Sequence, residues 1–217
     1  MSLTVDVISD VVCPWCYIGK VKLQTALELF RKAHPNDEPP TVRWHPFQLN
    51  PDLAAAGVDR SEYVSKKFGD RAATVYDRVK NVGLDVGIEF AFDKIQRQPN
   101  TRKAHSLIAA CAGDSLLQER MVQTLFDAYF INACDLTSDA VLEELAMSAG
   151  LDAQLISHAL HSAEAVLEIE QADTQAREMG VQGVPFFVFN GRLAVSGAQP
   201  PETLVQAMKE AITAAQE

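Results

Sequence analysis

The chain has 217 residues, of which 19 are Lys or Arg and 29 are Asp or Glu, so its formal net charge is −10 at pH 7. This charge makes nucleic acid and anionic membranes poor partners. Hydrophobic residues form 47% of the chain, enough for a core, which excludes disordered and small disulfide-scaffold proteins. Neither a signal peptide nor an apolar run of ~18 residues is evident, so we expect a cytosolic protein whose cysteines are reduced.

A β-α-β unit is predicted for the first fifty residues. Alternating apolar residues over positions 3–7 are typical of a strand with one buried face. Apolar residues at positions 23, 26, 27 and 30 have helical spacing, which predicts a helix from about residue 14 to the break at Pro35. A second alternating stretch over positions 42–46 predicts another strand, which ends at Asn50.

The segment from Pro51 to about Gly180 is predicted to be almost entirely helical. Its periodic stretches carry apolar side chains at spacings of three and four residues, as on one face of a helix. The last stretch is followed by Gly180, a residue type that commonly ends helices. The four apolar stripes consist of Ala72, Val75, Tyr76 and Val79; of Val122, Leu125, Phe126 and Tyr129; of Leu142, Leu145, Ala146 and Ala149; and of Ala165, Ile169, Ala172, Ala176 and Met179.

A hairpin and a final helix are predicted after this helical segment. Residues 184–189 form a continuous apolar run, which predicts a buried strand. The dipeptide Asn190-Gly191 is a strong signal for a hairpin turn, and residues 193–195 supply the returning strand. The dipeptide Pro200-Pro201 then opens a helix.

The order of elements is therefore β-α-β, a helical block, then β-β-α, which indicates an α/β fold. Each flanking part is too small to bury a sheet alone. We therefore expect residues 1–50 and 175–217 to form one discontinuous domain, with residues 51–174 inserted as an α-helical domain.

A cysteine pair, Cys13-Pro14-Trp15-Cys16, lies where the first strand gives way to the first helix. The positive end of a helix favours a thiolate, so Cys13, the more exposed of the two, is expected to attack a disulfide. Cys16, one turn in, is expected to resolve the resulting mixed disulfide. Two other interpretations are half of a zinc site and a pair of inert core cysteines. The first lacks further ligands nearby, and the second fits poorly at a strand-to-helix turn.

The stretch Gly183-Val184-Pro185-Phe186 precedes the apolar strand. A cis Pro185 would expose the backbone of Val184 to an extended peptide and would place the proline ring beside Cys13. Bond statistics alone favour a trans bond by about twenty to one.

Five stretches of this sequence resemble the DsbA-type thiol oxidoreductases of the thioredoxin superfamily, and within them the cytosolic FrnE-like branch. They occur in the family's order and span almost the whole chain. A lone CxxC is weak evidence, whereas the series is specific. The stretches are residues 9–20 (SDVVCPWCYIGK), 45–51 (HPFQLNP), 99–101 (PNT) with Ala104-His105, 180–189 (GVQGVPFFVF) and 195–199 (VSGAQ).

The resemblance implies a thioredoxin-like fold, formed by the two flanking parts and interrupted by the helical insert. It also implies that Cys13 is the nucleophile, Cys16 the resolving thiol and Pro185 the cis proline of the substrate groove. We expect a cytosolic dithiol-disulfide oxidoreductase that acts on thiol- or disulfide-containing proteins, peptides or small molecules; disulfide isomerase activity is compatible with the same pair. No permanently bound cofactor or metal is expected, and glutathione is a candidate redox partner.

An alternative function follows from a related branch, the kappa-class glutathione transferases and 2-hydroxychromene-2-carboxylate isomerases. Those proteins carry a serine in place of the nucleophilic cysteine, whereas this chain has both Cys13 and Cys16. The dithiol function is therefore preferred, and a glutathione-dependent small-molecule isomerase or transferase is the alternative.

Further residues are candidates for the substrate site. Pro14, Trp15 and Val184 adjoin the expected groove, and Trp15 is expected to be a partly exposed substrate contact. Asp10, three residues before Cys13, is either a proton acceptor for Cys16 or a turn and cap residue.

A second group of candidates comes from the Asn-Thr-x-x-Ala-His stretch of the family. Asn100 or Thr101 is a candidate cap for the helix that carries His105. His105 either lines the active site or packs elsewhere as an ordinary histidine. We include Asn100 and His105 among the substrate-binding candidates.

The remaining cysteines and histidines are expected to have structural or surface roles. Cys111 and Cys134 fall in or beside helical stripes, where core packing is the default and a second redox pair the alternative. His158 and His161 have i, i+3 spacing but no evident third ligand, so a solvated helix face is preferred to a metal site.

Overall fold

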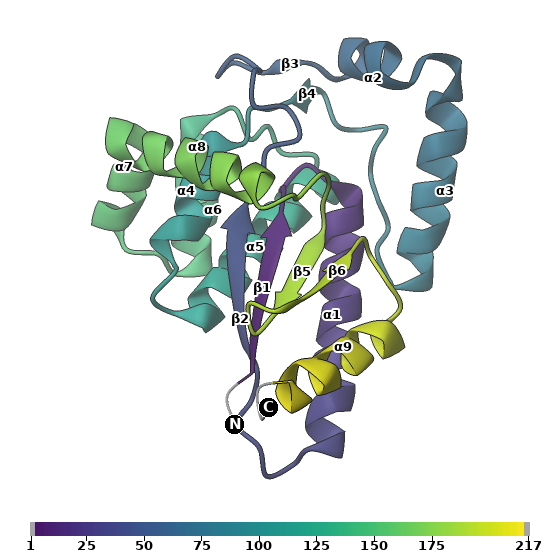
Figure 1. Cartoon of the computed structure of the whole chain (residues 1–217). Helices are drawn as coiled ribbons and strands as arrows, with labels where there is room; N and C mark the ends of the chain where they lie inside the picture. The colour runs from purple at the N-terminus through teal and green to yellow at the C-terminus, as the bar shows by residue number, and fades with distance from the viewer. Residues whose placement is uncertain (1–2, 215–217) are drawn as a thin grey trace.

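The computed structural model describes residues 3–214, which contain a four-stranded sheet in the order β2-β1-β5-β6 (Figure 1). β1 and β2 are parallel, whereas β5 pairs antiparallel with both β1 and β6. The expected strands are thus confirmed, although β2 ends at Pro46 and not at Asn50 as predicted. The apolar run that follows Gly183 becomes a strand only after Pro185, which has no backbone N–H to give to a ladder. The strands are β1 (Thr4–Ser9), β2 (Thr41–Pro46), β5 (Phe186–Phe189) and β6 (Leu193–Ser196).

Helices account for most of the remaining chain. All four apolar stripes lie on helices, apart from Met179 at the end of the fourth, and the first and last helices occur where they were expected. The helices are α1 (Pro14–Ala33), α2 (Arg60–Phe68), α3 (Ala72–Asp85), α4 (Arg102–Ala110), α5 (Ser115–Phe130), α6 (Asp139–Ala149), α7 (Ala153–His161), α8 (Ala163–Glu178) and α9 (Pro201–Thr213), with a 3₁₀ turn, η1 (Gly69–Arg71), between α2 and α3.

The insert also contains strands that the sequence pattern did not indicate. β3 (Val58–Asp59) and β4 (Arg97–Gln98) pair antiparallel as a two-stranded ribbon. Immediately after β3, the Asp59 carboxylate accepts hydrogen bonds from the N–H groups of Ser61 and Glu62 and caps α2. These contacts determine where α2 begins.

The insert surrounds the end of the sheet at which β1 stops. In Figure 1, α2 and the β3–β4 ribbon lie beyond the tips of β1 and β2, and α3 runs alongside α1, which it contacts. α4, α5 and α8 lie on the side of the sheet away from α3, where they contact β2. The first turn of α1, which carries the cysteine pair, is therefore flanked by the insert.

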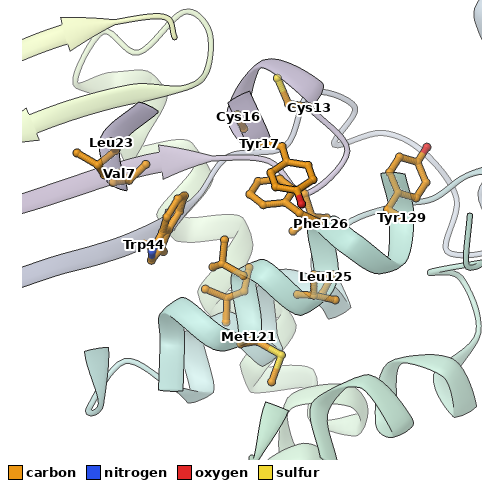
Figure 2. Packing of buried hydrophobic residues seen from close by; sticks show 14 of the residues in the cluster. Val7, Cys13, Cys16, Tyr17, Leu23, Trp44, Met121, Leu125, Phe126 and Tyr129 are labelled. Atoms are coloured by element: carbon orange, nitrogen blue, oxygen red, sulfur yellow. The ribbon is translucent and has the colours of Figure 1, made fainter. Parts of the chain in front are cut away.

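One hydrophobic core joins the sheet, α1 and the insert. Tyr17 of α1 stacks on Phe126 of α5, with ring centroids 5.0 Å apart and an interplanar angle of 4° (Figure 2). Tyr17 also meets the edge of Phe90, at a centroid distance of 6.1 Å. The expected end of the insert at residue 174 falls inside α8, which runs without a break from Ala163 to Glu178.

The residues after α8, Met179 and Gly180, differ in how well they match the prediction. Gly180 has φ 89° and follows the end of the helix, as expected for a terminating glycine. The assignment of Met179 to the apolar stripe was wrong, because this residue lies past the last helical residue and is 70% exposed. Within residues 3–214, no helix is both long and apolar enough to cross a membrane.

Candidate active site

The strand-to-helix turn after β1 positions Cys13 as the N-cap of α1. The backbone N–H of Cys13 donates to the Asp10 carbonyl (3.0 Å), and the Cys13 carbonyl accepts from the N–H of Cys16 (3.0 Å). Pro14 occupies the first turn of the helix, where its missing N–H costs no helical hydrogen bond. The Cys13 side chain makes no capping hydrogen bond. Its thiol instead donates a weak hydrogen bond to the Val184 carbonyl, with a sulfur-to-oxygen distance of 3.6 Å.

The two thiols differ less in exposure than expected. Cys13 is 4% exposed and Cys16 is 1% exposed, so Cys13 is the more accessible of the two but is itself buried. Figure 2 shows Cys13 at the margin of the core, with its sulfur directed away from Tyr17 and Phe126. The four cysteines are all free thiols in this structure.

The environment of Cys16 favours its protonated form. Burial, followed by contact with the Cys13 thiol, raises the pKa of Cys16 well above its usual value. The backbone N–H of Asp10 and the hydroxyl of Ser9 oppose this effect and lower the pKa of Cys16 in part.

Pro185 packs against the first turns of α1. The Val184–Pro185 peptide bond is cis. A Cβ atom added at Gly19 would lie 2.8 Å from Pro185 Cγ and 3.3 Å from Phe187 Cζ. Gly19 therefore permits the close approach of Pro185 to α1. Sequence reasoning assigned no role to Gly19, although it lies in the first of the matching stretches.

A cavity of about 290 Å³ opens beside Cys13. The expected contacts Pro14, Trp15 and Val184 line it, and Trp15 is half-buried, as predicted. The opposite wall comes from the insert and was missed, although Arg60, Tyr63 and Lys67 occur at spacings of three and four residues that could have indicated one face of a helix. Its lining residues are Val12, Cys13, Pro14, Trp15, Leu49, Gly183 and Val184 on one side, and Arg60, Tyr63, Lys67, Phe68, Val75, Tyr76, Val79 and Gln98 on the other.

Asp10 and His105 form a buried pair away from the cavity wall. His105 Nε2 lies 3.3 Å from Asp10 Oδ1, and both side chains are almost fully buried. The second carboxylate oxygen of Asp10 accepts a hydrogen bond from the N–H of Leu49 (2.8 Å). The Asp10 carboxylate thus has a structural role, which was one of its two proposed interpretations, and its action as a proton acceptor for Cys16 stays a prediction. His105 packs beneath the site and does not line the cavity.

Asn100 lies outside the cavity that contains Cys13. Its Oδ1 accepts a hydrogen bond from the N–H of Arg102 (3.0 Å) and its Nδ2 donates to the Leu53 carbonyl (2.7 Å). Asn100 therefore caps α4, whereas the Thr101 side chain makes no capping bond. Both ends of the Asn100 amide are hydrogen-bonded to backbone groups, and the side chain does not line the cavity. This placement does not support a direct contact between Asn100 and a substrate beside Cys13.

The other cysteines and histidines are separate from this site. Cys111 is buried, and burial raises its pKa to about 11, while Cys134 is half-buried. His161 lies 3.5 Å from a carboxylate oxygen of Glu143 on the surface of the insert. Over residues 3–214, no three His, Cys, Asp or Glu side chains are grouped as metal ligands.

Several solved structures have the same fold. A probable DsbA oxidoreductase from Streptomyces coelicolor matches with a TM-score of 0.85 and 28% identity, over 97% of this chain and 90% of that chain. A 2-hydroxychromene-2-carboxylate isomerase matches with a TM-score of 0.70 and 17% identity, over 98% of both chains. The cytosolic disulfide reductase DsbM from Pseudomonas aeruginosa matches with a TM-score of 0.61 and 18% identity, over 98% of this chain and 97% of that chain.

Two of the five stretches on which the resemblance was based meet at the start of α1, because Val184 and Pro185 lie against the turn that carries the cysteine pair. The family model for the DSBA-like thioredoxin domain matches residues 4–209, nearly the entire chain. The chain therefore belongs to the DSBA-like thioredoxin domain family.

Proposed function

We propose that the protein is a cytosolic dithiol-disulfide oxidoreductase whose redox pair is Cys13 and Cys16. The observation that carries the proposal is the placement of Cys13 as the N-cap of α1, beside an open cavity, with Cys16 one turn behind it. The N-terminal end of a helix stabilises a thiolate, and the cavity gives a substrate disulfide access to that thiolate. Similarity to a cytosolic disulfide reductase supports the reaction class and the compartment.

The reaction proceeds in two exchanges. The Cys13 thiolate attacks one sulfur of the substrate disulfide, which forms a mixed disulfide and releases the first substrate thiolate. Cys16 then loses its proton and attacks the Cys13 sulfur, which forms the Cys13–Cys16 disulfide and releases the second substrate thiolate. The substrate gains two electrons and the protein loses two. The reverse sequence oxidises a substrate dithiol.

The surroundings of Cys16 support its role as the resolving thiol. The N–H of Asp10 and the hydroxyl of Ser9 stabilise negative charge on its sulfur. We propose the Asp10 carboxylate as the proton acceptor, with His105 as the partner that orients it at 3.3 Å. Trp15, Pro14 and Val184 would contact the substrate from the side of the cavity that carries the cysteines.

Reduction of insulin and reactivation of scrambled ribonuclease test this function. We expect Cys13→Ser to abolish both activities and Cys16→Ser to accumulate a mixed disulfide that mass spectrometry detects on Cys13. Cys111→Ser is the matched control, because Cys111 lies away from the cavity, and should retain activity. Equal rates for the wild-type protein and Cys13→Ser would refute the proposal.

The direction of electron flow is set by the reduction potential of the pair. Titration in glutathione redox buffers, with the dithiol quantified by alkylation and mass spectrometry, gives this potential. A value below the cytosolic poise identifies a reductase, and a value above it identifies an oxidant or isomerase. The same titration tests glutathione as a redox partner through the protein–glutathione mixed disulfide.

A second candidate function is a glutathione-dependent isomerase or transferase acting on a small molecule. The observation that favours it is the partly apolar cavity, one wall of which comes from the insert, together with the structural match to a 2-hydroxychromene-2-carboxylate isomerase. Calorimetry with reduced glutathione and the Cys13→Ser variant separates binding from exchange. Absence of binding at millimolar glutathione would remove this candidate.

A further inference from the structure

Arg60, at the start of α2, carries a buried positive charge that forms no salt bridge with any residue from 3 to 214. The residue is 8% exposed, and its guanidinium donates hydrogen bonds to the neutral Gln98 side chain and to the Tyr76 hydroxyl (2.8 Å). Over residues 3–214, no carboxylate oxygen lies within 4.0 Å of it. Buried charges in proteins are ordinarily paired, because removing a charge from water is costly.

Lys67 adds a second positive charge to the same cavity wall. Its ammonium donates to the Tyr63 hydroxyl (2.7 Å) and lies 5.1 Å from the centroid of the Tyr63 ring. In the described part of the chain, Lys67 likewise has no carboxylate within salt-bridge distance. Tyr63 links the two cations, because Arg60 lies 5.6 Å from the same ring centroid.

The cavity is cationic in a protein that is strongly acidic overall. Two positive side chains and no Asp or Glu line it, while the whole chain carries a net charge of −10. The nearby Asp59 carboxylate is used to cap α2, and Asp10 is engaged by Leu49 and His105. Among the described residues, no salt bridge joins either carboxylate to Arg60 or Lys67.

We propose that Arg60 and Lys67 form an anion subsite that binds a carboxylate of a small disulfide substrate while one of its sulfurs meets Cys13. Cys13 lines the same cavity, and the volume of about 290 Å³ suits a small substrate or a fragment of one. A guanidinium has five N–H donors, and two of those of Arg60 are engaged by Gln98 and Tyr76. The planar arrangement of its N–H groups matches the two oxygens of a carboxylate. The inference rests on the proposed exchange reaction and names its substrate class.

The reaction at this site is an ordinary exchange. Cys13 attacks a sulfur of the carboxylate-bearing disulfide and releases one thiolate, and Cys16 then displaces the second thiolate from the mixed disulfide. The disulfide is reduced to two thiols as the cysteine pair is oxidised to a disulfide. The subsite holds the carboxylate of the half that becomes joined to Cys13, and it contributes to association and orientation until Cys16 displaces that half as the second thiolate.

Three small disulfides that share the same S–CH2–CH2 spacer and differ in the charge of the terminal group test the subsite. They are 3,3′-dithiodipropionate, which is anionic, 2-hydroxyethyl disulfide, which is neutral, and cystamine, which is cationic. Oxidation of the reduced protein by each is followed by stopped-flow tryptophan fluorescence, since Trp15 lies between the cysteines. Each rate constant is divided by that of free 2-mercaptoethanol with the same disulfide, which removes differences in intrinsic reactivity.

We expect the normalised rate to be about tenfold higher for the anionic than for the neutral disulfide, and lowest for the cationic one. Lys67→Gln should reduce the anionic preference about threefold. Lys66→Gln is the control, because it removes the same charge from a neighbouring exposed residue outside the cavity and should leave the preference unchanged. Arg60→Lys, which keeps the charge but loses the planar fork, should also reduce the preference.

The outcomes separate the subsite from the exchange reaction. If the protein reacts with all three disulfides without an anionic preference, or if Lys66→Gln and Lys67→Gln have equal effects, the subsite is refuted and the oxidoreductase proposal stands. If none of the three disulfides oxidises the wild-type cysteine pair, both proposals fail.

Discussion

Replacement of Gly19 by alanine tests whether the close packing of Pro185 against α1 determines the rate of disulfide exchange. The added Cβ would lie 2.8 Å from Pro185 Cγ, about 0.6 Å short of ordinary van der Waals contact. The opposing atom belongs to a ring fixed to the backbone and not to the free end of a flexible side chain. Pro185 therefore has to move, and the Val184 carbonyl, 3.6 Å from the Cys13 sulfur, moves with it.

The expected stability change is a difference between two effects. Alanine favours the helix over glycine by about 0.8–1 kcal/mol, whereas overpacking in a close-packed region costs about 1–3 kcal/mol. We expect a net destabilisation of roughly 0–2 kcal/mol, which for a chain of this length lowers the melting temperature by up to about 8 °C. The functional effect should be larger, because a shift of about 0.6 Å exceeds the ~0.5 Å within which catalytic groups must be held. We expect about a tenfold slower exchange.

Thermal unfolding and stopped-flow oxidation of the reduced protein measure the two effects separately. Gly113→Ala is the control, because a Cβ there meets nothing within 4 Å and the site is not involved. If Gly19→Ala matches the wild-type protein in both exchange rate and melting temperature, Pro185 is free to yield and the reasoning is wrong.

Three further predictions concern thiol reactivity and one buried ion pair. Because burial raises the pKa of Cys16 well above its usual value, release of thiol from a preformed mixed disulfide should accelerate about tenfold per pH unit from pH 6 to pH 9 without levelling off; a plateau near pH 7 would contradict this. Cys111, whose pKa burial raises to about 11, should resist iodoacetamide at pH 8 until urea unfolds the protein, as peptide mass mapping would show; rapid native labelling would contradict its burial. Lys20, 1% exposed, pairs with Glu119 at 2.6 Å, so Glu119→Gln should lower stability by roughly 1–3 kcal/mol in thermal unfolding, while Lys20→Met should change it by less than about 1 kcal/mol; equal losses for both would refute the assignment of the cost to an unpaired buried charge.

Features encoded within short stretches of sequence could be predicted. The alternation in β1, the helix start at Pro14 and the Asn190-Gly191 turn each depend on neighbours a few residues away. The cysteine pair, its place at the helix N-terminus and the partial exposure of Trp15 followed from the same local rules.

Features that depend on distant partners could not be predicted. β3 and β4 are two-residue strands that pair across about forty residues, so neither carries a periodic signal. The burial of Cys13 depends on residues of the insert and on Val184, 171 positions away. For Asn100 and His105, the sequence pattern did not give the direction of the side chains, which is set by contacts to Leu53 and Asp10.

The two walls of the cavity come from different parts of the chain, and this affects how substrate preference can evolve. The thiols are on a turn that is held by the frame through hydrogen bonds at Asp10 and Cys13, whereas the facing cations are on a nine-residue helix of the insert. α2 contacts its immediate neighbours η1, α3, β3 and β4, and the turn that bears the thiols keeps its own hydrogen bonds. Substitutions along α2 can therefore change which molecules approach the sulfur while the electron-transferring pair keeps its geometry, so substrate preference and redox chemistry can evolve separately.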